Sequence, residues 1–472
     1  MKMHIVAAAT LGLAVSGFAQ PVFKAGYSKV DITPALGTPM SGYYHHRAAN
    51  GVIDPLRARC LALSDGETTA LVYAIDNLGL NNEMIARVKA EVAATAKIPE
   101  GAIYLAGSHI HTGPCTGWKS AANNIEGDEP LVKAANEVLV AGCVKAAKLA
   151  VGDLAPSKIM IGRGEATGIS FIRRFKMKDG SVRTNPPRND PDVVEPLGKP
   201  DESLQLVRFV REGAKEIALI NFQCHPDVVS GNKFSADWPG IAADTLEDAF
   251  KGEIHAMLLN GAQGDTNHYR QKWRKGDYLP TGINMARHMA RTIVGGALKA
   301  WDYCRPVPAG KVQADTREVE IFVNKGRSDE FELAEKWAAL VKAKRRHEIP
   351  GEGMLNVTRS AWACRVVETR DWPDTKKLPV SVVSVGRALA FGGFCGEPFT
   401  VFGVELKNRS KFAMTIPTCT TNGYNGYFPN ESAFTVGGYE NATSRYQKGS
   451  GERLLNGLLS TMDEFWANAK AN

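Results

Sequence analysis

The sequence has 472 residues, of which 44% are hydrophobic and 23% are charged. These proportions are typical of a globular protein with a substantial core, and they argue against fibrous, disordered and membrane-embedded classes. The net charge of +7 is spread along the chain apart from one basic cluster at 342–347, so it gives no indication of a nucleic-acid partner.

The first 19 residues have the pattern of a secretory signal peptide. Lys2 precedes a short apolar run, and Gly17 and Ala19 supply the small residues of a cleavage site. The run is too short for a stable transmembrane span. We therefore expect cleavage after Ala19 and a periplasmic or secreted mature protein. Because we find no internal repeat or linker, residues 25–470 are expected to form a single domain.

Eight cysteines are dispersed along the chain without any CxxC spacing. This spacing argues against a zinc ribbon and against a small disulfide-dense scaffold, although an oxidising compartment would allow some of them to pair. Three of them, Cys115, Cys224 and Cys395, lie close to the polar motifs described below. We interpret them as packing residues, because Cys is among the most frequently buried residue types; metal ligation is the alternative.

The first half of the chain predicts alternating strands and helices. Apolar alternation over 68–75 indicates a strand, which is followed by a helix over about 82–96 and a strand over 103–107. A second helix is expected over about 130–150, and Asp179-Gly180 between two extended runs predicts a hairpin turn. The β-α-β order is typical of an α/β core, which we expect to be a mixed sheet flanked by helices.

In the second half, residues 184–200 are rich in Pro and Asp and are expected to form a long loop that covers a site. Asp237 is expected to cap a helix that carries a proline in its first turn. Further helices are predicted over about 282–300 and 328–347, the latter with basic residues in its last turn, where the helix dipole favours them. Residues 381–394 resemble a hairpin.

Four apolar runs, each suited to a buried strand, end in polar corners that contain glycine. The runs and the polar residues that follow them are 103–107 with His109 and His111, 216–224 with His225, 254–260 with Asp265 and Asn267, and 388–395 with Glu397. In open α/β sheets, ligands bind outside the carboxyl ends of the strands. We therefore expect these four corners to converge on one site.

The residue types at these corners indicate metal chemistry. Side chains at i and i+2 of a strand share a face, so His109 and His111 would point the same way and share a metal, or divide metal binding and proton handling between them. His109, His225 and Glu397 are a plausible zinc set that leaves room for water or substrate. Two structural alternatives stay open: His225 could cap backbone groups, and Glu397 could pair with an arginine.

An ordered set of motifs carries a family resemblance over nearly the whole mature chain. The motifs are DITP at 31–34, SHIHTGP at 108–114, CHP at 224–226, GD at 264–265, GE at 396–397, GY at 426–427 and YE at 439–440. This set resembles the amidohydrolase domain of the neutral/alkaline (non-lysosomal) ceramidases. The resemblance implies cleavage of the amide of an N-acylsphingosine and a zinc ion held by His109, His225, Glu397 and Tyr427.

The same resemblance implies roles for further residues. His111 would contact substrate or support a zinc ligand, and Tyr439 would line the substrate site. Arg173 resembles the active-site arginine of the family, with Arg174 as the alternative shifted by one residue. Asp265 would be catalytic or, as we favour, would orient groups around the site.

The sequence departs from the family at the nucleophile. Ceramidases place a serine shortly after the Gly-Asp motif, whereas Asn267 occupies that position here. A carboxamide is not an acyl-accepting nucleophile, so an acyl-enzyme would require Thr266 instead. Direct attack by a water molecule that zinc activates is the simpler hypothesis, with Asn267 and Arg173 holding the substrate or the developing oxyanion.

The leading hypothesis is a zinc-dependent hydrolase of an amide or related acyl bond. Because the sequence ends soon after Tyr439, we expect a short member without the C-terminal immunoglobulin-like domain. We expect a small-molecule or lipid-like acylated substrate, which need not be a long-chain ceramide, and no amphipathic membrane anchor is readable. The alternatives are a metal-dependent TIM-barrel amidohydrolase, whose HxH also follows a strand, and a non-catalytic binding protein that retains the ceramidase-like fold.

Overall fold

The computed structural model describes residues 22–117, 129–274, 276 and 278–469. The expected signal peptide lies outside these residues, so its cleavage stays a prediction. Within the described part of the chain, no helix is long and apolar enough to cross a membrane.

The largest element of the fold is a nine-stranded mixed sheet. Its strand order is β14-β12-β11-β6-β1-β3-β4-β5, with β16 added beside β6. The bounds are β1 (Lys24–Asp31), β3 (Arg57–Ser64), β4 (Thr69–Ile75), β5 (Ile103–Gly107), β6 (Ala155–Glu165), β11 (Ser203–Arg211), β12 (Glu216–Phe222), β14 (Ile254–Asn260) and β16 (Arg305–Val307). Only β12 with β14 and β4 with β5 pair in parallel. This sheet excludes a TIM barrel, which requires eight parallel strands.

A second sheet packs beside the first, with the order β17 (Val312–Phe322), β18 (Thr375–Val385), β19 (Leu389–Phe394) and β21 (Met414–Thr418). The predicted hairpin is confirmed: β18 and β19 are antiparallel, and the turn uses Gly386 at a φ of +53°. The two sheets share one hydrophobic core, in which the rings of Tyr104 from β5 and Phe391 from β19 lie 6.2 Å apart.

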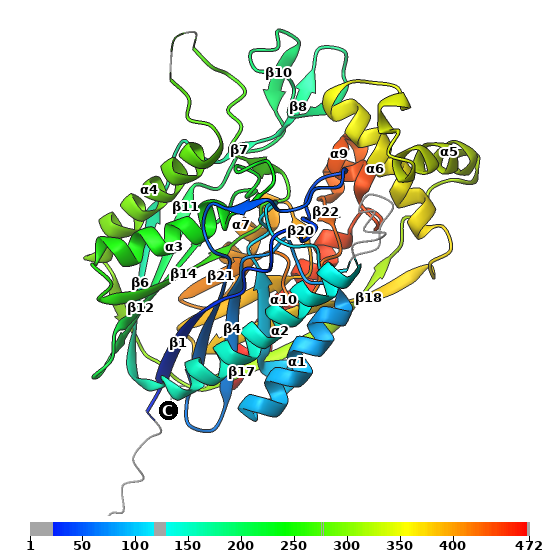
Figure 1. Cartoon of the computed structure of the whole chain (residues 1–472). Helices are drawn as coiled ribbons and strands as arrows, with labels where there is room; N and C mark the ends of the chain where they lie inside the picture. The colour runs from blue at the N-terminus through cyan, green and yellow to red at the C-terminus, as the bar shows by residue number, and fades with distance from the viewer. Residues whose placement is uncertain (1–21, 118–128, 275, 277, 470–472) are drawn as a thin grey trace, which may run out of the picture.

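Helices cover both sheets, which confirms the predicted fold class (Figure 1). α1 (Asn82–Ala96) and α2 (Glu129–Gly152) pack together, and α2 lies against β1 and β3. α3 (Asp237–Ala249) and α4 (Gly282–Trp301) form a second pair on the other half of the large sheet, and α7 (Thr400–Arg409) and α10 (Ser450–Asn468) cover the second sheet. The close approach of α2 to β1 requires Gly142, because a Cβ there would lie 2.3 Å from the side chain of Ile32.

The local sequence explains the bounds of α1. The side chain of Asn81 accepts a hydrogen bond from the backbone N–H of Met84, which satisfies one of the free donors at the start of the helix. At the other end Lys97 adopts a left-handed conformation, with a φ of +56°, and its N–H bonds to the carbonyl of Ala93. The helix therefore begins and ends where the periodicity predicts.

Two of the predicted segments were wrong in extent. The helix expected over 328–347 is only α5 (Phe331–Lys342), between the short 3-10 turns η2 (Ser328–Glu330) and η3 (Arg346–Glu348). Lys344 has a φ of +61°, so the chain leaves the helix there. Lys342 of the basic cluster therefore lies in the last turn of α5, whereas the rest of the cluster follows the helix.

The segment 184–200 is not a loop throughout. It contains β10 (Val193–Pro196), which pairs with β8 (Arg174–Met177); β8 also pairs with β9 (Val182–Thr184) through the predicted turn at Asp179-Gly180. The Pro-rich composition concealed β10, because its hydrogen bonds come from a neighbour distant in sequence. The remaining described elements are β2 (Gly51–Val52), η1 (Glu100–Ala102), β7 (Phe171–Ile172), β13 (Lys233–Phe234), β15 (Thr266–Asn267), α6 (Gly353–Thr369), β20 (Glu397–Pro398), β22 (Tyr427–Phe428), α8 (Glu431–Val436) and α9 (Tyr439–Thr443).

The predicted convergence of the four strand ends is confirmed, although β5 and β14 stand at opposite ends of the strand order. The side chain of Asn260, at the end of β14, donates to the carbonyl of Ser108, 3.1 Å away, just after β5. Residues that follow β21 bridge the same two ends: the N–H of Gly107 donates to Thr420, and the N–H of Cys419 donates to Asn260. The second sheet thus ties the two ends of the first together.

Candidate active site

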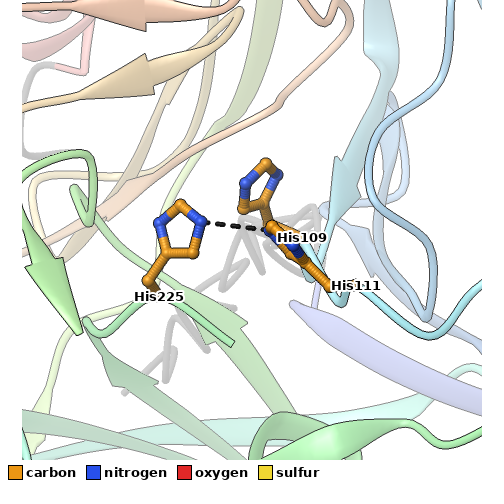
Figure 2. A group of neighbouring side chains, drawn as sticks. All are labelled: His109, His111 and His225. Atoms are coloured by element: carbon orange, nitrogen blue, oxygen red, sulfur yellow. Dashed lines mark hydrogen bonds between the residues drawn. The ribbon is translucent and has the colours of Figure 1, made fainter. Parts of the chain in front are cut away.

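Three histidines from two strand ends form the centre of the site (Figure 2). One ring nitrogen from each of His109, His111 and His225 lies within 4.8 Å of the others, and all three side chains are buried. The Nε2 atoms of His111 and His225 are 3.1 Å apart. Within the described residues this is a group that could hold a metal ion.

The backbone of His109 departs from the strand that was expected to carry it. β5 ends at Gly107, and His109 has a φ of +68°, which is rare for a residue with a side chain. Strand alternation is therefore not the reason that His109 and His111 face one site. Instead, the N–H of His109 donates to the carbonyl of Asn77, and the N–H of His111 donates to that of Pro226. These long-range bonds hold the turn.

The geometry of His109 and Glu397 fits a bound cation. The Nδ1 atom of His109 is 2.8 Å from the carbonyl oxygen of Leu78, to which it donates, so Nε2 is the ring nitrogen that is free to face the site. Nε2 faces Oε2 of Glu397 at 3.1 Å, and Oε2 accepts no hydrogen bond from the described residues. Either a proton shared between these two buried atoms or a metal ion bound by both would satisfy the pair.

Burial and charge set the protonation of the group. Burial lowers the pKa of His111 and of His225 well below the usual value, so both rings are neutral and able to donate lone pairs. Burial opposes the ionisation of Glu397, but His109 and Arg173 outweigh it and lower the pKa of this carboxyl to about 2. Neutral imidazoles beside an ionised carboxylate are the donor set that zinc and similar metals bind.

Tyr427 stands next to Glu397. The two residues pair in register between the parallel strands β20 and β22, so their side chains leave the pair on the same side. Tyr424, which the sequence analysis missed, donates its hydroxyl to Oε1 of Glu397 at 3.0 Å. The one feature of the sequence that could have indicated Tyr424 as a site residue is its position three residues before Tyr427.

The structure brings Arg173, and not Arg174, to the site. Its Nε donates to Glu440 at 2.8 Å, its Nη2 donates to the carbonyl of Gly264, and its guanidinium lies 5.3 Å from the ring centre of Tyr427. Arg174 pairs with the other oxygen of Glu440, at 3.3 Å, and donates to the carbonyl of Gly437.

Tyr439 packs against Tyr427, with 5.7 Å between ring centres. Its hydroxyl is 3.3 Å from that of Tyr44. Tyr43 and Tyr44 are further site residues that were not predicted from the sequence. Tyr43 donates to Asp227, whose Oδ1 is 3.6 Å from Nδ1 of His111. This carboxylate therefore stands behind the ring of His111.

Asp265 and Asn267 lie near the site but bond to protein groups. Oδ1 of Asp265 accepts from both the backbone N–H and the hydroxyl of Thr400, at 2.7 and 2.8 Å, at the start of α7. The amide of Asn267 donates to Asn185 at 2.6 Å and accepts from the N–H of Tyr269 at 2.9 Å. Asp265 thus anchors a helix, and Asn267 anchors two loops; a catalytic role for either stays a prediction.

Asp237 was expected to cap α3, but Ala236 holds the cap position. Asp237 has a φ of +48°, and its Oδ2 accepts from the N–H groups of Val228 and Val229 at 3.0 and 2.9 Å. It therefore fixes the loop that directly follows His225.

Two cavities border the imidazole cluster. A cavity of about 110 Å³ lies beside His109 and Glu397, and one of about 210 Å³ lies beside His225 and Arg173. Tyr44 and Tyr439 line both. A larger surface hollow, of about 810 Å³, borders His268 and Arg270 but is lined by none of the three clustered histidines.

The cysteines take no part in this donor set. All eight lie in the described part of the chain, and all are free and buried. Burial raises the pKa of the Cys224 and Cys395 thiols to about 12, so both are neutral at ordinary pH. Cys115 is also buried, in a small cluster with Val132.

Comparison with known proteins agrees with this fold. The chain is similar in structure to the neutral ceramidase from Pseudomonas aeruginosa, with a TM-score of 0.73, 16% identity, and coverage of 96% of this chain and 76% of that chain. It is also similar to a ceramidase complexed with C2, with a TM-score of 0.69, 15% identity, and coverage of 94% and 75%.

A family model described as neutral/alkaline non-lysosomal ceramidase, N-terminal, matches residues 23–268, more than half of the sequence. The matched part contains His109, Arg173 and His225, whereas Glu397 and Tyr427 lie beyond it. Ceramidases hydrolyse an amide bond, so this match indicates an amide hydrolase. The chain belongs to the neutral/alkaline non-lysosomal ceramidase family.

Proposed function

We propose that the chain is a zinc-dependent hydrolase of an amide or related acyl bond, exported to the periplasm or the medium. One observation carries the metal part of this proposal: three buried imidazoles have ring nitrogens within 4.8 Å of one another, and Nε2 of His109 also faces Glu397 Oε2 at 3.1 Å. Membership of an amide-hydrolase family supports the reaction class.

Two ligand sets are compatible with the cluster. The family resemblance favours His109, His225, Glu397 and Tyr427, whereas distances between ring nitrogens also group His111 with the other two histidines. We favour the first set. His111 has Asp227 behind its Nδ1, at 3.6 Å, which suits a ring that holds or moves a proton at Nε2.

A zinc ion held there would supply a Lewis acid that lowers the pKa of water and polarises an acyl carbonyl. The chain's own residues position the substrate. Arg173, held by Glu440, presents a buried positive charge beside Tyr427, where it can hold the acyl oxygen as negative charge develops. The hydroxyl of water is added to the acyl carbon, the C–N bond breaks, and the amine leaves with the second proton of the water.

Asn267 supports water as the nucleophile. Its amide is occupied by Asn185 and Tyr269, and the hydroxyl of neighbouring Thr266 donates to the carbonyl of Gln263 at 3.2 Å. The family serine is therefore replaced by a group that cannot form an acyl-enzyme, and the adjacent hydroxyl is engaged with the backbone.

The test uses purified mature protein, analysed for bound metal and then assayed for acid release from a panel of N-acyl and ester substrates. We expect one zinc ion per chain and turnover that a chelator removes and added zinc restores. His225→Ala should lose both, whereas His347→Ala, at an exposed histidine outside the site, should keep both. A protein without stoichiometric zinc contradicts the proposal, and zinc without turnover supports the binding-protein alternative.

Export is tested separately. The N-terminal pattern supports cleavage after Ala19, so the protein recovered from the periplasm or medium should begin at Gln20. Retention of Met1 in an intracellular protein would contradict this part of the proposal and would leave the catalytic part untouched.

A further inference from the structure

The cavity beside His109 and Glu397 is small and has a charged wall. Its volume of about 110 Å³ lies well below the roughly 300–1,000 Å³ of pockets that enclose drug-sized ligands. Tyrosines 43, 44, 424, 427 and 439 line much of it. The helix α6 adds Arg365 and Glu368 to the lining, and the segment after α9 adds Arg445. A wall of this kind is unsuited to a long alkyl chain.

Neighbouring turns of α6 present these groups together. Ala361, Cys364, Arg365 and Glu368 all line the cavity, and their spacings of three, four and seven residues place them on one face of the helix. The arrangement is therefore a property of the helix face and not of one mobile side chain.

The charges on this wall do not balance. Arg445 donates from Nε to both carboxylate oxygens of Glu368, each at 3.0 Å, so these two charges compensate each other. Arg365 has no carboxylate within ion-pair distance among the described residues. It donates only to backbone carbonyls, from Nη1 to Asn324 at 3.0 Å and from Nε to Ala442 at 3.3 Å.

Arg365 is 6% exposed, so its positive charge is largely removed from water. Burial is the main cause that lowers the pKa of this guanidinium to about 10; Arg445 lowers it further, and the carboxylate of Glu330, beyond ion-pair distance, opposes the shift only in part. The Nη2 atom of Arg365 has no hydrogen-bond partner among the described residues, although the side chain lines the cavity. A ligand carboxylate would supply both the missing charge and the missing acceptor.

The neighbouring cavity combines apolar and charged walls. Its aliphatic lining comes from Met354 and Val357, whereas Arg173, Arg346 and Asp227 supply charged groups. Its volume is about 210 Å³, so the two cavities together only reach the lower end of the range for enclosed ligands.

We infer that the cavity beside His109 and Glu397 receives a short acyl group that ends in a carboxylate, which Arg365 binds, so that the preferred substrates are small anionic amides. This inference rests on the proposed amide hydrolysis and names its substrate class. Water still adds to the acyl carbon and the amine still leaves; the carboxylate at the far end of the acyl group only positions it.

The first experiment compares three amides of 4-nitroaniline, with succinyl, succinamoyl and palmitoyl groups, on the zinc-loaded enzyme. Succinamoyl has nearly the shape of succinyl but lacks its charge. We expect kcat/KM to be about tenfold or more higher for succinyl, because a charge-assisted hydrogen bond in a desolvated site gives a factor of this order. Equal values for the first two, or a preference for palmitoyl, would overturn the inference.

Variants of α6 locate the effect. Arg365→Gln should bring the succinyl-to-succinamoyl ratio close to one, and Arg365→Lys should retain part of it. Arg359→Gln is the matched control, because Arg359 lies on the same helix, outside the cavity lining, near the ring of Trp337. Thermal melting reports whether each variant folds. A folded Arg365→Gln that keeps the full ratio refutes the assignment, and if this variant fails to fold, the wild-type ratio and Arg365→Lys decide.

A binding measurement separates this inference from the proposed function. If no amide in the panel is hydrolysed, the proposed function fails, and calorimetric titration of succinate into the metal-loaded protein still tests the anion site. Binding that Arg365→Gln weakens about tenfold and Arg359→Gln leaves unchanged supports the site. Equal binding by all three proteins, or no binding, overturns it.

Discussion

Two regions that border the same cavity are built in different ways. One is the corner that holds the three histidines, and the other is the wall that α6 presents. Each imidazole follows a buried strand, and backbone hydrogen bonds such as His109 N–H to Asn77 fix the turn that carries it. The α6 wall uses side chains of a helix face, where Arg365 donates to two backbone carbonyls and to no carboxylate among the described residues. On the proposals made above, the strand ends hold the groups for chemistry and the helix face sets which substrate fits.

The sharpest way to test the corner is Glu397→Gln. Loss of the carboxylate charge should abolish stoichiometric zinc and lower kcat/KM by at least about 10³-fold, because metal polarisation contributes several kcal/mol to the barrier. Metal analysis and steady-state kinetics measure the two effects. His111→Ala should lower kcat while it keeps the zinc; the reverse pattern, zinc lost in His111→Ala and kept in Glu397→Gln, would favour the three-histidine ligand set.

A second change loosens Arg173, which lies beside Tyr427. Glu440→Gln removes the buried partner of Arg173, which lies 2.8 Å from Glu440 and in contact with Tyr427. Breaking a buried pair costs roughly 3–5 kcal/mol of folding free energy. We expect a lower Tm and a kcat/KM reduced by about 10–100-fold, with zinc content unchanged. An active, equally stable variant would show that Arg173 is held by its other contacts alone.

The pH dependence of folding stability tests how Asp237 holds the loop that follows His225. Burial raises the pKa of this carboxyl to about 7 in the folded chain, against an ordinary value of 3.8. Between these values the folded state binds more protons than the unfolded state, so the contribution of Asp237 to stability falls as pH rises from about 4 to 7. Denaturant unfolding of wild type and Asp237→Asn across this range measures the difference. A pH-independent difference would contradict the assigned shift.

The smallest effect is expected at Asn267. Asn267→Ala removes two hydrogen bonds, to Asn185 and Tyr269, and should cost about 1–2 kcal/mol of stability while turnover stays within about tenfold. Asn267→Ser should allow an acyl-enzyme to be trapped and seen by mass spectrometry. Thr266→Ala is the matched control. Complete loss of turnover in Asn267→Ala would require a direct catalytic role for the amide.

Much of the site was predictable because it sits at the ends of apolar strands. His109, His225 and Glu397 each follow such a run. In the structure, a ring nitrogen of each histidine lies within 4 Å of Oε2 of Glu397. Tyr43, Tyr44 and Arg365 were not predictable in the same way. They come from a loop and from a helix whose periodicity gives no indication of the cavity it borders.

Errors in the predicted elements have the same origin. The helix after η2 stopped at Lys342, because Lys344 adopts a left-handed backbone conformation that composition does not reveal. Strand β10 was hidden in a Pro-rich segment, because its partner β8 lies some twenty residues earlier. In both cases a local pattern was overridden by backbone geometry or by a hydrogen-bonded neighbour elsewhere in the chain.

The sequence by itself determined the strongly periodic helices and strands, the polar corners that follow the strands, and the family to which the ordered motifs belong. These depend on side-chain periodicity and on residue types at short range. Only the tertiary structure decided that the two ends of a nine-stranded sheet meet through a second sheet, that His109 turns into the left-handed region, and that Arg365 borders the cavity. Those features arise from contacts between distant segments, which no local pattern encodes.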